Sequence, residues 1–400
     1  MDSPSSWVGS SRARVDRGLA ARARRPLAAL VIVTAAAVAA SCAAPGPSRR
    51  SVRRPTTTTT STVPATTSVP ISTTTTTAPA PPTTRPASIV AGSHVASGTR
   101  LGVGGCSLFP VDHAFHADVR SLPVRAGSDA TVATIGGDAV PVRAGFSNRV
   151  WEGSRRGTPV NVIDAATAQP TDFAVAAYSL DWSSASGVPL PAEPRYEGWP
   201  GRAWDRHLLL VDPATCDSRE LINVQPAGEN LTSGGRWYAD AITTIDLSSD
   251  RAPDHGVVAA KLSLLSGMVR YDEVASGDIG HVITMSLPVV RSGDPVWPAQ
   301  GSDGRSDDPA APPMGSWFRL RPDADLSGLG PEALVVAHAL QKYGAVAVDS
   351  GPFMSLDGEP DLRWDDDDLD TLESLRASDL QVIDPTPMRA TSDPEDLRIR

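Results

Sequence analysis

A short polar motif precedes one of the most apolar segments of the chain. Asp205-Arg206-His207 leads into Leu208-Leu209-Leu210-Val211, a run typical of a buried strand. Asp205 and His207 are two residues apart, so in an extended chain their side chains project from the same face. A carboxylate placed there can orient an imidazole as a general base. We interpret His207 as a candidate catalytic residue and Asp205 as a substrate-binding residue; the alternative is an ion pair at a sheet edge.

A second polar cluster, Arg270-Tyr271-Asp272-Glu273, follows an apolar stretch. If this segment is a strand, Arg270 and Asp272 share one face and Tyr271 and Glu273 share the other. Glycosidases use two carboxyl groups in contrasted environments, roughly 5–10 Å apart. We predict Asp272 and Glu273 as catalytic carboxylates, with Arg270 and Tyr271 binding substrate. A structural network of salt bridges is the alternative.

Two further carboxylates, Asp349 and Asp365, are candidate catalytic partners. Asp349 follows an apolar strand-like run, and Asp365 belongs to the acidic run Trp364-Asp365-Asp366-Asp367-Asp368. This run lacks the alternating ligands and the glycine of a calcium loop, so it predicts a helix N-terminus. The chain has no CxxC, no GxGxxG and no P-loop motif. We therefore expect neither a metal site nor a cofactor.

Tryptophans are frequent for so few aromatic residues. Nine of the 20 aromatic side chains are Trp, against six Phe and five Tyr, and several lie in loops beside Gly, Pro, Arg or Asp. An indole in a loop can stack on a sugar ring while neighbouring carboxylates bind its hydroxyls. We predict Trp297 and Trp364 as sugar-binding residues; packing in the core is the alternative.

The charge of the chain is divided unevenly. Residues 1–90 hold eleven of the 36 basic residues and two of the 46 acidic ones, which leaves residues 91–400 with a net charge of −19. A domain this acidic is repelled by phosphate backbones. We therefore exclude nucleic acid as a partner and expect a polysaccharide of the cell envelope or of the extracellular space.

Several phrases together resemble an uncharacterised family of secreted actinobacterial proteins over about residues 105–385. The resemblance implies one domain and supplies no reaction. Where that family has Asp-Asn-Gly after a late strand, this chain has Asp349-Ser350-Gly351. The phrases that carry the resemblance are Phe109-Pro110-Val111-Asp112, Asp205-Arg206-His207, Gly267-Met268-Val269-Arg270-Tyr271-Asp272-Glu273-Val274, Val296-Trp297-Pro298-Ala299 and Arg363-Trp364-Asp365-Asp366-Asp367-Asp368-Leu369.

Short β-branched runs broken by Gly, Pro and Asp must position these residues. Their spacing predicts a mainly β fold with a few helices (α+β), a single domain of the β-sandwich or jelly-roll type. Helices are expected from Pro331 to Gly344, from Asp367 to Leu375 with Asp365 or Asp366 as the cap, and from Pro253 to Leu264. The expected strands include residues 131–135, 160–164, 173–178, 207–212, 241–247, 281–287, 317–320 and 345–348.

The N-terminal 87 residues have the composition of an export and tethering segment. Basic residues precede an apolar run over residues 27–40, and small residues then precede Cys42, which predicts a signal peptide over residues 1–41. The segment resembles a lipoprotein signal, in which Cys42 would carry a lipid anchor. The alternative is an uncleaved membrane span, because the apolar stretch can be extended from Leu27 to Ala44, just under the roughly 20 residues that a span needs. Residues 42–87 are rich in Thr and Pro and predict a disordered stalk.

The acidic domain at residues 88–400 is thus expected outside the membrane. Its two cysteines, Cys106 and Cys216, would then form a disulfide in an oxidising space. The expected function is that of a monomeric, membrane-anchored surface protein with glycoside-hydrolase-like activity. The alternatives are a non-catalytic module that binds carbohydrate or protein, and a structural envelope lipoprotein.

Overall fold

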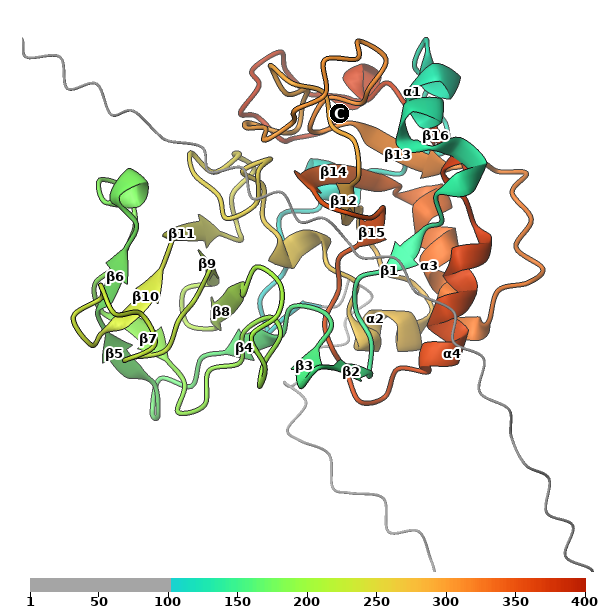
Figure 1. Cartoon of the computed structure of the whole chain (residues 1–400). Coiled ribbons are helices and arrows are strands. Elements are labelled where there is room, and N and C mark those ends of the chain that lie inside the picture. Colours follow the sequence, from blue (N-terminus) through green and yellow to red (C-terminus); the bar gives the residue numbers. More distant parts are fainter. Residues whose placement is uncertain (1–101) are drawn as a thin grey trace, which may run out of the picture. The chain divides into compact units, whose positions relative to one another are not determined.

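The structure is a computed structural model that describes residues 102–400 (Figure 1). A six-stranded mixed sheet forms the larger part of it. Strands β12 and β14 run parallel at its centre, and β13 and β16 continue the sheet in antiparallel fashion. The order is β1 (Arg143–Ala144), β15 (Ser355–Leu356), β12 (Ile283–Leu287), β14 (Ala345–Ser350), β13 (Trp317–Leu320) and β16 (Leu380–Val382).

A four-stranded sheet forms the second part of the described structure. Its order is β11 (Ala241–Asp246), β9 (Asp217–Ile222), β8 (Leu208–Asp212) and β4 (Val160–Val162). Leu209 and Val211 of β8 pack into the main core, whereas Leu208 and Leu210 pack into a smaller cluster on the other face. Burial on both faces explains why this strand is a continuous apolar run and not an alternating one.

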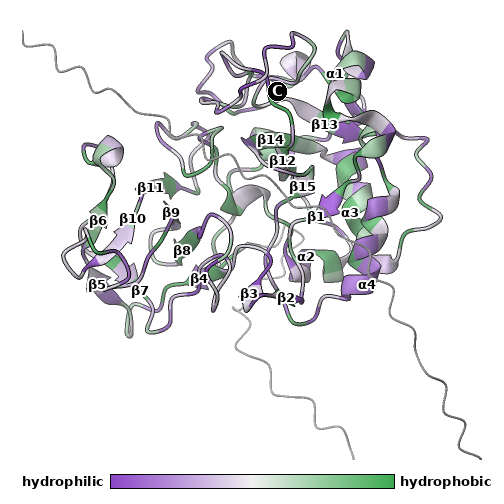
Figure 2. Cartoon of the chain, viewed as in Figure 1, coloured by the Kyte–Doolittle hydropathy of each residue, from purple (hydrophilic) through white to green (hydrophobic). Residues whose placement is uncertain are grey.

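Short strand pairs and helices complete the described part. Figure 2 shows hydrophobic and hydrophilic residues alternating along α3, whereas α4 is hydrophilic. The pairs are β2 (Val150–Trp151) with β3 (Ser154–Arg155), β5 (Gln169–Thr171) with β7 (Val188–Leu190), and β6 (Phe173–Val175) with β10 (Trp237–Ala239). The α-helices are α1 (Ser128–Ile135), α2 (Tyr271–Ser276), α3 (Pro331–Lys342) and α4 (Asp366–Leu369). The 3-10 turns are η1 (Ala114–His116), η2 (Gly137–Ala139), η3 (Ala177–Ser179), η4 (Leu265–Gly267), η5 (Asp370–Ser374), η6 (Ala377–Asp379) and η7 (Thr386–Met388).

The prediction of a mainly β, α+β domain is confirmed, as are most of its elements. Helix α3 begins at Pro331, and Gly344 follows its end with a φ of 76°. Helix α4 is capped by Asp365 and continues as η5. Seven of the eight expected strands lie within one or two residues of the strands β4, β6, β8, β11, β12, β13 and β14, except that β6 ends at Val175.

Two local predictions are wrong because backbone partners differ from those that the sequence pattern favours. Residues 131–135 belong to helix α1, which buries Thr131, Val132 and Ile135 at helical spacing. The cluster at Arg270 is the start of helix α2 and not a strand, since the Glu273 side chain accepts the backbone N–H of Arg270. The face assignment that assumed a strand therefore does not hold.

The segment from Ala252 to Gly267 contains no α-helix, contrary to the predicted helix over residues 253–264. Several of its backbone groups bond to neighbours in both sheets. The N–H groups of Leu264 and Leu265 donate to the buried carboxylate of Glu220 on β9, and the N–H of Ala260 donates to Val348 on β14. The segment therefore joins the two sheets.

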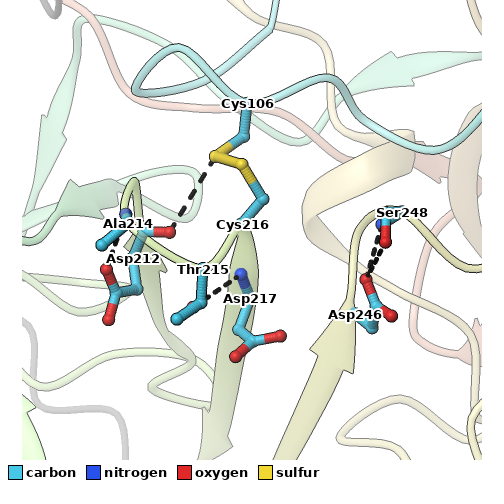
Figure 3. Close-up of a disulfide and its surroundings, with 8 residues drawn as sticks. All are labelled: Cys106, Asp212, Ala214, Thr215, Cys216, Asp217, Asp246 and Ser248. Atoms are coloured by element: carbon cyan, nitrogen blue, oxygen red, sulfur yellow. Dashed lines mark hydrogen bonds between the residues drawn. A yellow bond between two sulfur atoms is a disulfide. The ribbon is translucent and has the colours of Figure 1, made fainter.

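The predicted disulfide between Cys106 and Cys216 is present. Figure 3 shows that it joins the first described segment to the turn between β8 and β9. The two Cα atoms lie 5.4 Å apart, and 110 residues separate the cysteines in sequence. A cross-link over so long a loop removes many conformations from the unfolded chain.

Replacing both cysteines, Cys106→Ser with Cys216→Ser, should lower the free energy of unfolding by about 2–5 kcal/mol, because the unfolded chain regains that freedom. Urea unfolding of the oxidised protein and of the double variant measures the difference. Equal unfolding midpoints would show that the bridge does not stabilise this fold.

The predicted signal peptide, the Thr/Pro stalk and Cys42 lie outside the described residues. Within residues 102–400, no helix is both long and apolar enough to cross a membrane. These residues belong to one compact unit.

Candidate functional site

His207 lies at the start of β8, on the face of the four-stranded sheet that meets the main core. Its Nδ1 is 3.0 Å from Oε2 of Glu197, and its Nε2 is 3.2 Å from the carbonyl oxygen of Val257. Both partners are acceptors, so both ring nitrogens must carry hydrogen. The geometry therefore favours a buried imidazolium cation.

The charges around His207 support the same protonation state. Burial would lower the pKa of His207, but the hydrogen bond to Glu197 and the charges of Glu197 and Asp205 raise it to about 9. A cation at neutral pH cannot accept a proton, which corrects the expectation that His207 is a general base. Its positive charge instead offsets the negative charges of nearby carboxylates. Asp205 is one of these carboxylates, and it is exposed to solvent.

Asp349 approaches the same cluster from the end of β14. The register of β12 and β14 shifts between Met285 and Ser286, so Ser286 pairs with Asp349 across a bulge. Such bulges redirect the side chains of a strand. Burial, followed by the charge of Asp303, raises the pKa of Asp349 to about 7, although His207 and the N–H of Ala259 oppose the shift.

Asp357 reaches the cluster from the segment after β15. Its backbone N–H donates to Thr284 on β12, which fixes the segment against the sheet. Burial raises the pKa of Asp357 to about 7, and the charges of Asp349 and Glu197 add to the rise, whereas Thr284 and His207 oppose it. Asp349 and Asp357 are thus two interacting carboxyl groups that hold protons near neutral pH.

An open groove of about 470 Å³ lies at the end of β14, next to Asp349 in sequence. Ser350 and Gly351, which directly follow Asp349, form one wall. The hydroxyl of Ser350 donates a short hydrogen bond to Asp303, the carboxylate that acts on Asp349. Pro288, Val289, Val290, Arg305 and Ser306 line the rest of the groove. It lies at the carboxyl ends of the parallel strands β12 and β14, where α/β sheets commonly bind ligands.

The cluster on helix α2 has a structural role by its contacts. Arg270 and Glu273 form a buried ion pair, and Nε2 of His281 lies 3.3 Å from the Glu273 carboxylate. Glu359 accepts the N–H of Tyr271 at 3.0 Å, and burial raises its pKa to about 7. The predicted pair Asp272 and Glu273 is divided, because Asp272 instead bonds Arg363 at the surface.

The acidic run near Trp364 caps helices, as the sequence predicted. Asp365 accepts the N–H groups of Asp367 and Asp368 at the start of α4. Asp368 accepts those of Glu332 and Ala333 at the start of α3. Asp365 therefore lies in a cap and is not brought into the cluster around His207. Among residues 102–400, no group of His, Cys, Asp and Glu is arranged to hold a metal ion.

The two tryptophans predicted to bind sugar are buried. Trp297 stacks on Trp317 and donates its indole N–H to the carbonyl of Asp396. Trp364 packs against Phe146 and Tyr271 and donates to the carbonyl of Glu359. Their faces are occupied by protein, so the prediction is corrected for both. Tyr271 is likewise covered, by Trp364 and by the guanidinium of Arg363, which lies 4.1 Å from its ring centre.

Sequence reasoning found part of this cluster and missed the rest. It identified His207, Asp205 and Asp349, and the structure brings all three together. It missed Glu197, Asp303 and Asp357, which lie singly in loops that carry no motif. The only signal was the alternation of Asp357 and Glu359 about Gly358 in an extended segment.

Raised pKa values predict that folding stability falls as pH rises. Asp349 and Asp357 bind protons more tightly in the folded than in the unfolded protein, so the stability they add is lost between their ordinary 3.8 and about 7. His207 adds stability that is complete below 6.5 and lost as pH rises through about 9. Unfolding midpoints should fall from pH 5 to pH 9, and Asp349→Asn should flatten the part below pH 7. A wild-type midpoint that rises from pH 5 to pH 7 would contradict this assignment.

Glu273→Gln should lower the free energy of unfolding by about 3–5 kcal/mol, because it removes the carboxylate from a buried ion pair with Arg270. Asp272→Asn is the matched control, and its exposed pair with Arg363 should contribute at most about 1 kcal/mol. Urea unfolding of both variants tests the structural role of this cluster. Equal small losses would show that Glu273 is not needed for folding.

Comparisons with protein-family models, with curated proteins and with solved structures found no match to this chain. The resemblance to secreted actinobacterial proteins therefore stays a prediction. The geometry and charges of residues 102–400 are the basis for assigning a function.

Proposed function

We propose that this protein is an exported, membrane-anchored enzyme that hydrolyses glycosidic bonds in an extracellular polysaccharide. Asp349 and Asp357 would be its acid–base pair, in place of Asp272, Glu273 and Asp365. The observation that carries the proposal is a cluster that holds two carboxyl groups with pKa values raised to about 7, one of which, Asp349, directly precedes the residues that line an open groove.

Such a pair suits glycoside hydrolysis because the reaction needs a proton donor and a carboxylate together. The protonated carboxyl donates to the glycosidic oxygen as the bond to the leaving sugar breaks. The ionised carboxyl then activates water or attacks the anomeric carbon. Two like charges close together cannot both ionise easily, so one proton stays on the pair near neutral pH.

The surroundings of the pair supply the remaining requirements. His207 is a fixed positive charge beside the pair, which limits how far the two pKa values rise. The groove beside Ser350 is open and not enclosed, which suits a polymeric ligand. The net charge of −19 over residues 91–400 favours a neutral glycan over an anionic one.

The disulfide is consistent with the proposed location, since such bridges persist in oxidising spaces outside the cytosol. Attachment through Cys42 and spacing by the Thr/Pro stalk belong to this proposal. The polysaccharide and the membrane are the proposed partners, and the protein would act as a monomer.

A non-catalytic glycan-binding module is the second candidate. The observation that favours it is an exposed pair of tryptophans, Trp151 and Trp204, on the rim next to Asp205. In that case sugar would bind and no carboxylate would be needed for turnover.

Asp349→Asn and Asp357→Asn should each lower kcat at least a hundredfold, because general acid–base catalysis contributes about 10²–10⁴-fold. Release of reducing sugar from a panel of neutral cell-wall and storage polysaccharides measures the activity. The wild-type activity should be greatest near pH 7, where the pair holds one proton.

Asp272→Asn and Asp365→Asn serve as controls, since both carboxylates lie outside the cluster and should keep wild-type activity. Loss of activity in either control, with Asp349→Asn fully active, would overturn the assignment. Sugar binding without turnover on any polymer would favour the binding module.

A further inference from the structure

Two indole rings are left exposed at the edge of the carboxylate cluster. Trp151 is 58% exposed and Trp204 is 40% exposed. Their ring centres lie 6.3 Å apart, with the planes tilted by 44°. Large aromatic side chains are usually mostly buried, so two neighbouring exposed indoles are a feature that needs a reason.

The first indole is held by a tight hairpin. Trp151 ends β2, and the turn to β3 consists of Glu152 with a φ of 48° and Gly153 with a φ of 81°. Positive φ at both central residues is the type I′ geometry, whose twist matches paired strands. The hairpin therefore presents Trp151 in a fixed position.

The second indole is locked against this hairpin. The N–H of Ala203 donates to the Ser154 hydroxyl at 3.2 Å, and Ser154 forms a bridge with Pro200. Gly201 has no room for a side chain, because a Cβ there would lie 2.0 Å from the Ser154 oxygen. The hairpin and the loop before His207 are thus in direct contact.

The backbone at Trp204 is strained. Its φ of 62° and the φ of 56° at Arg206 both fall in the left-handed region, on either side of Asp205. Non-glycine residues there carry a penalty and cluster at functional sites. Arg206 is compensated by its ion pair with Glu229 and by its contact with the Tyr196 ring, whereas the Trp204 side chain stays exposed to solvent.

This pair continues into the proposed catalytic cluster. Asp205 directly follows Trp204, and its charge acts on both His207 and Asp349. Two of the nearby cations are already paired: Arg149 with acids of helix α4, and Arg202 with Glu229. The surface therefore offers two apolar rings beside the carboxylate of Asp205, within a domain whose net charge is negative.

We propose that Trp151 and Trp204 form a stacking subsite for a neutral pyranose unit of a polysaccharide whose chain continues toward Asp349 and Asp357. The C–H face of the sugar lies on the indoles, and its hydroxyls donate to Asp205. The direction of the chain rests on the proposed hydrolytic function, but the stacking subsite itself does not.

Affinity electrophoresis through gels that contain xylan, mannan, mixed-linkage β-glucan or starch tests the subsite, with polygalacturonate as the anionic control. The full chain carries Asp349→Asn throughout, so that the gel polymer is not degraded. The parent protein should be retarded by at least one neutral polymer and not by polygalacturonate. Trp151→Ala and Trp204→Gly should each weaken binding about tenfold, which corresponds to about 1.4 kcal/mol for the loss of one aromatic contact.

The choice of variants separates stacking from folding. Glycine suits the left-handed backbone at position 204, so Trp204→Gly should melt no lower than the parent protein. Trp204→Phe keeps a ring and should retain most of the affinity. Tyr178→Ala removes another exposed aromatic, in the 3-10 turn η3 that follows β6, and should bind like the parent.

Several outcomes would overturn the subsite. These are no retardation by any neutral polymer, unchanged binding in both Trp variants, or an equal loss in Tyr178→Ala. Retention of the polymer without any turnover by the wild-type chain would remove the hydrolytic proposal and leave the subsite standing. Turnover with an unchanged KM in both Trp variants would remove the subsite and leave the hydrolytic proposal standing.

Discussion

The positive charge on buried His207 is the interaction on which the centre of this protein depends. An isolated charge in a protein interior is very unfavourable, and His207 is stable there only because its two N–H groups meet the Glu197 carboxylate and the Val257 carbonyl. Those partners come from a loop before β8 and from the segment that joins the two sheets. The same cation opposes the rise in the pKa values of Asp349, on β14 of the other sheet, and of Asp357, in the segment after β15. One imidazolium thus couples both sheets of the fold.

Around His207, negative charges outnumber positive ones, and this affects the protonation of the carboxyl groups. More carboxylates than cations surround His207, so some of them are held in the protonated form near neutral pH. Where a fold only needs stability, apolar residues would fill such a place better. The contrast with helix α2 is informative, since there Arg270 and Glu273 form a closed pair. Next to α2, burial likewise raises the pKa of Glu359 to about 7, so the two places differ in the direct pairing of Glu273 with Arg270.

The tryptophans divide in a similar way. Trp297, Trp317 and Trp364 pack with other aromatic rings in the main core and satisfy their N–H groups on backbone carbonyls. Trp151 and Trp204 do neither, although the chain adopts a strained backbone at Trp204 to hold its position. Strain that leaves an apolar ring in water contributes nothing to folding. Ligand binding would explain why these two rings are exposed, and a neutral sugar fits both the apolar rings and the acidic surroundings.

The sequence by itself determined the local elements and the residue types of the site. The 3.6-residue period of α3, the capping acids of α4 and the apolar run of β8 depend on near neighbours, so they are legible in the chain. His207, Asp205 and Asp349 were also predictable, because each adjoins an apolar strand. Tertiary structure alone decided which carboxylates face His207, since Glu197, Asp303 and Asp357 come from separate loops. It also decided that Glu273 forms an ion pair with Arg270, whereas burial raises the pKa of Asp349. Finally, it decided that Trp204 is exposed and that Trp364 is buried. Protonation and burial depend on distances between segments far apart in sequence, and only folding sets those distances.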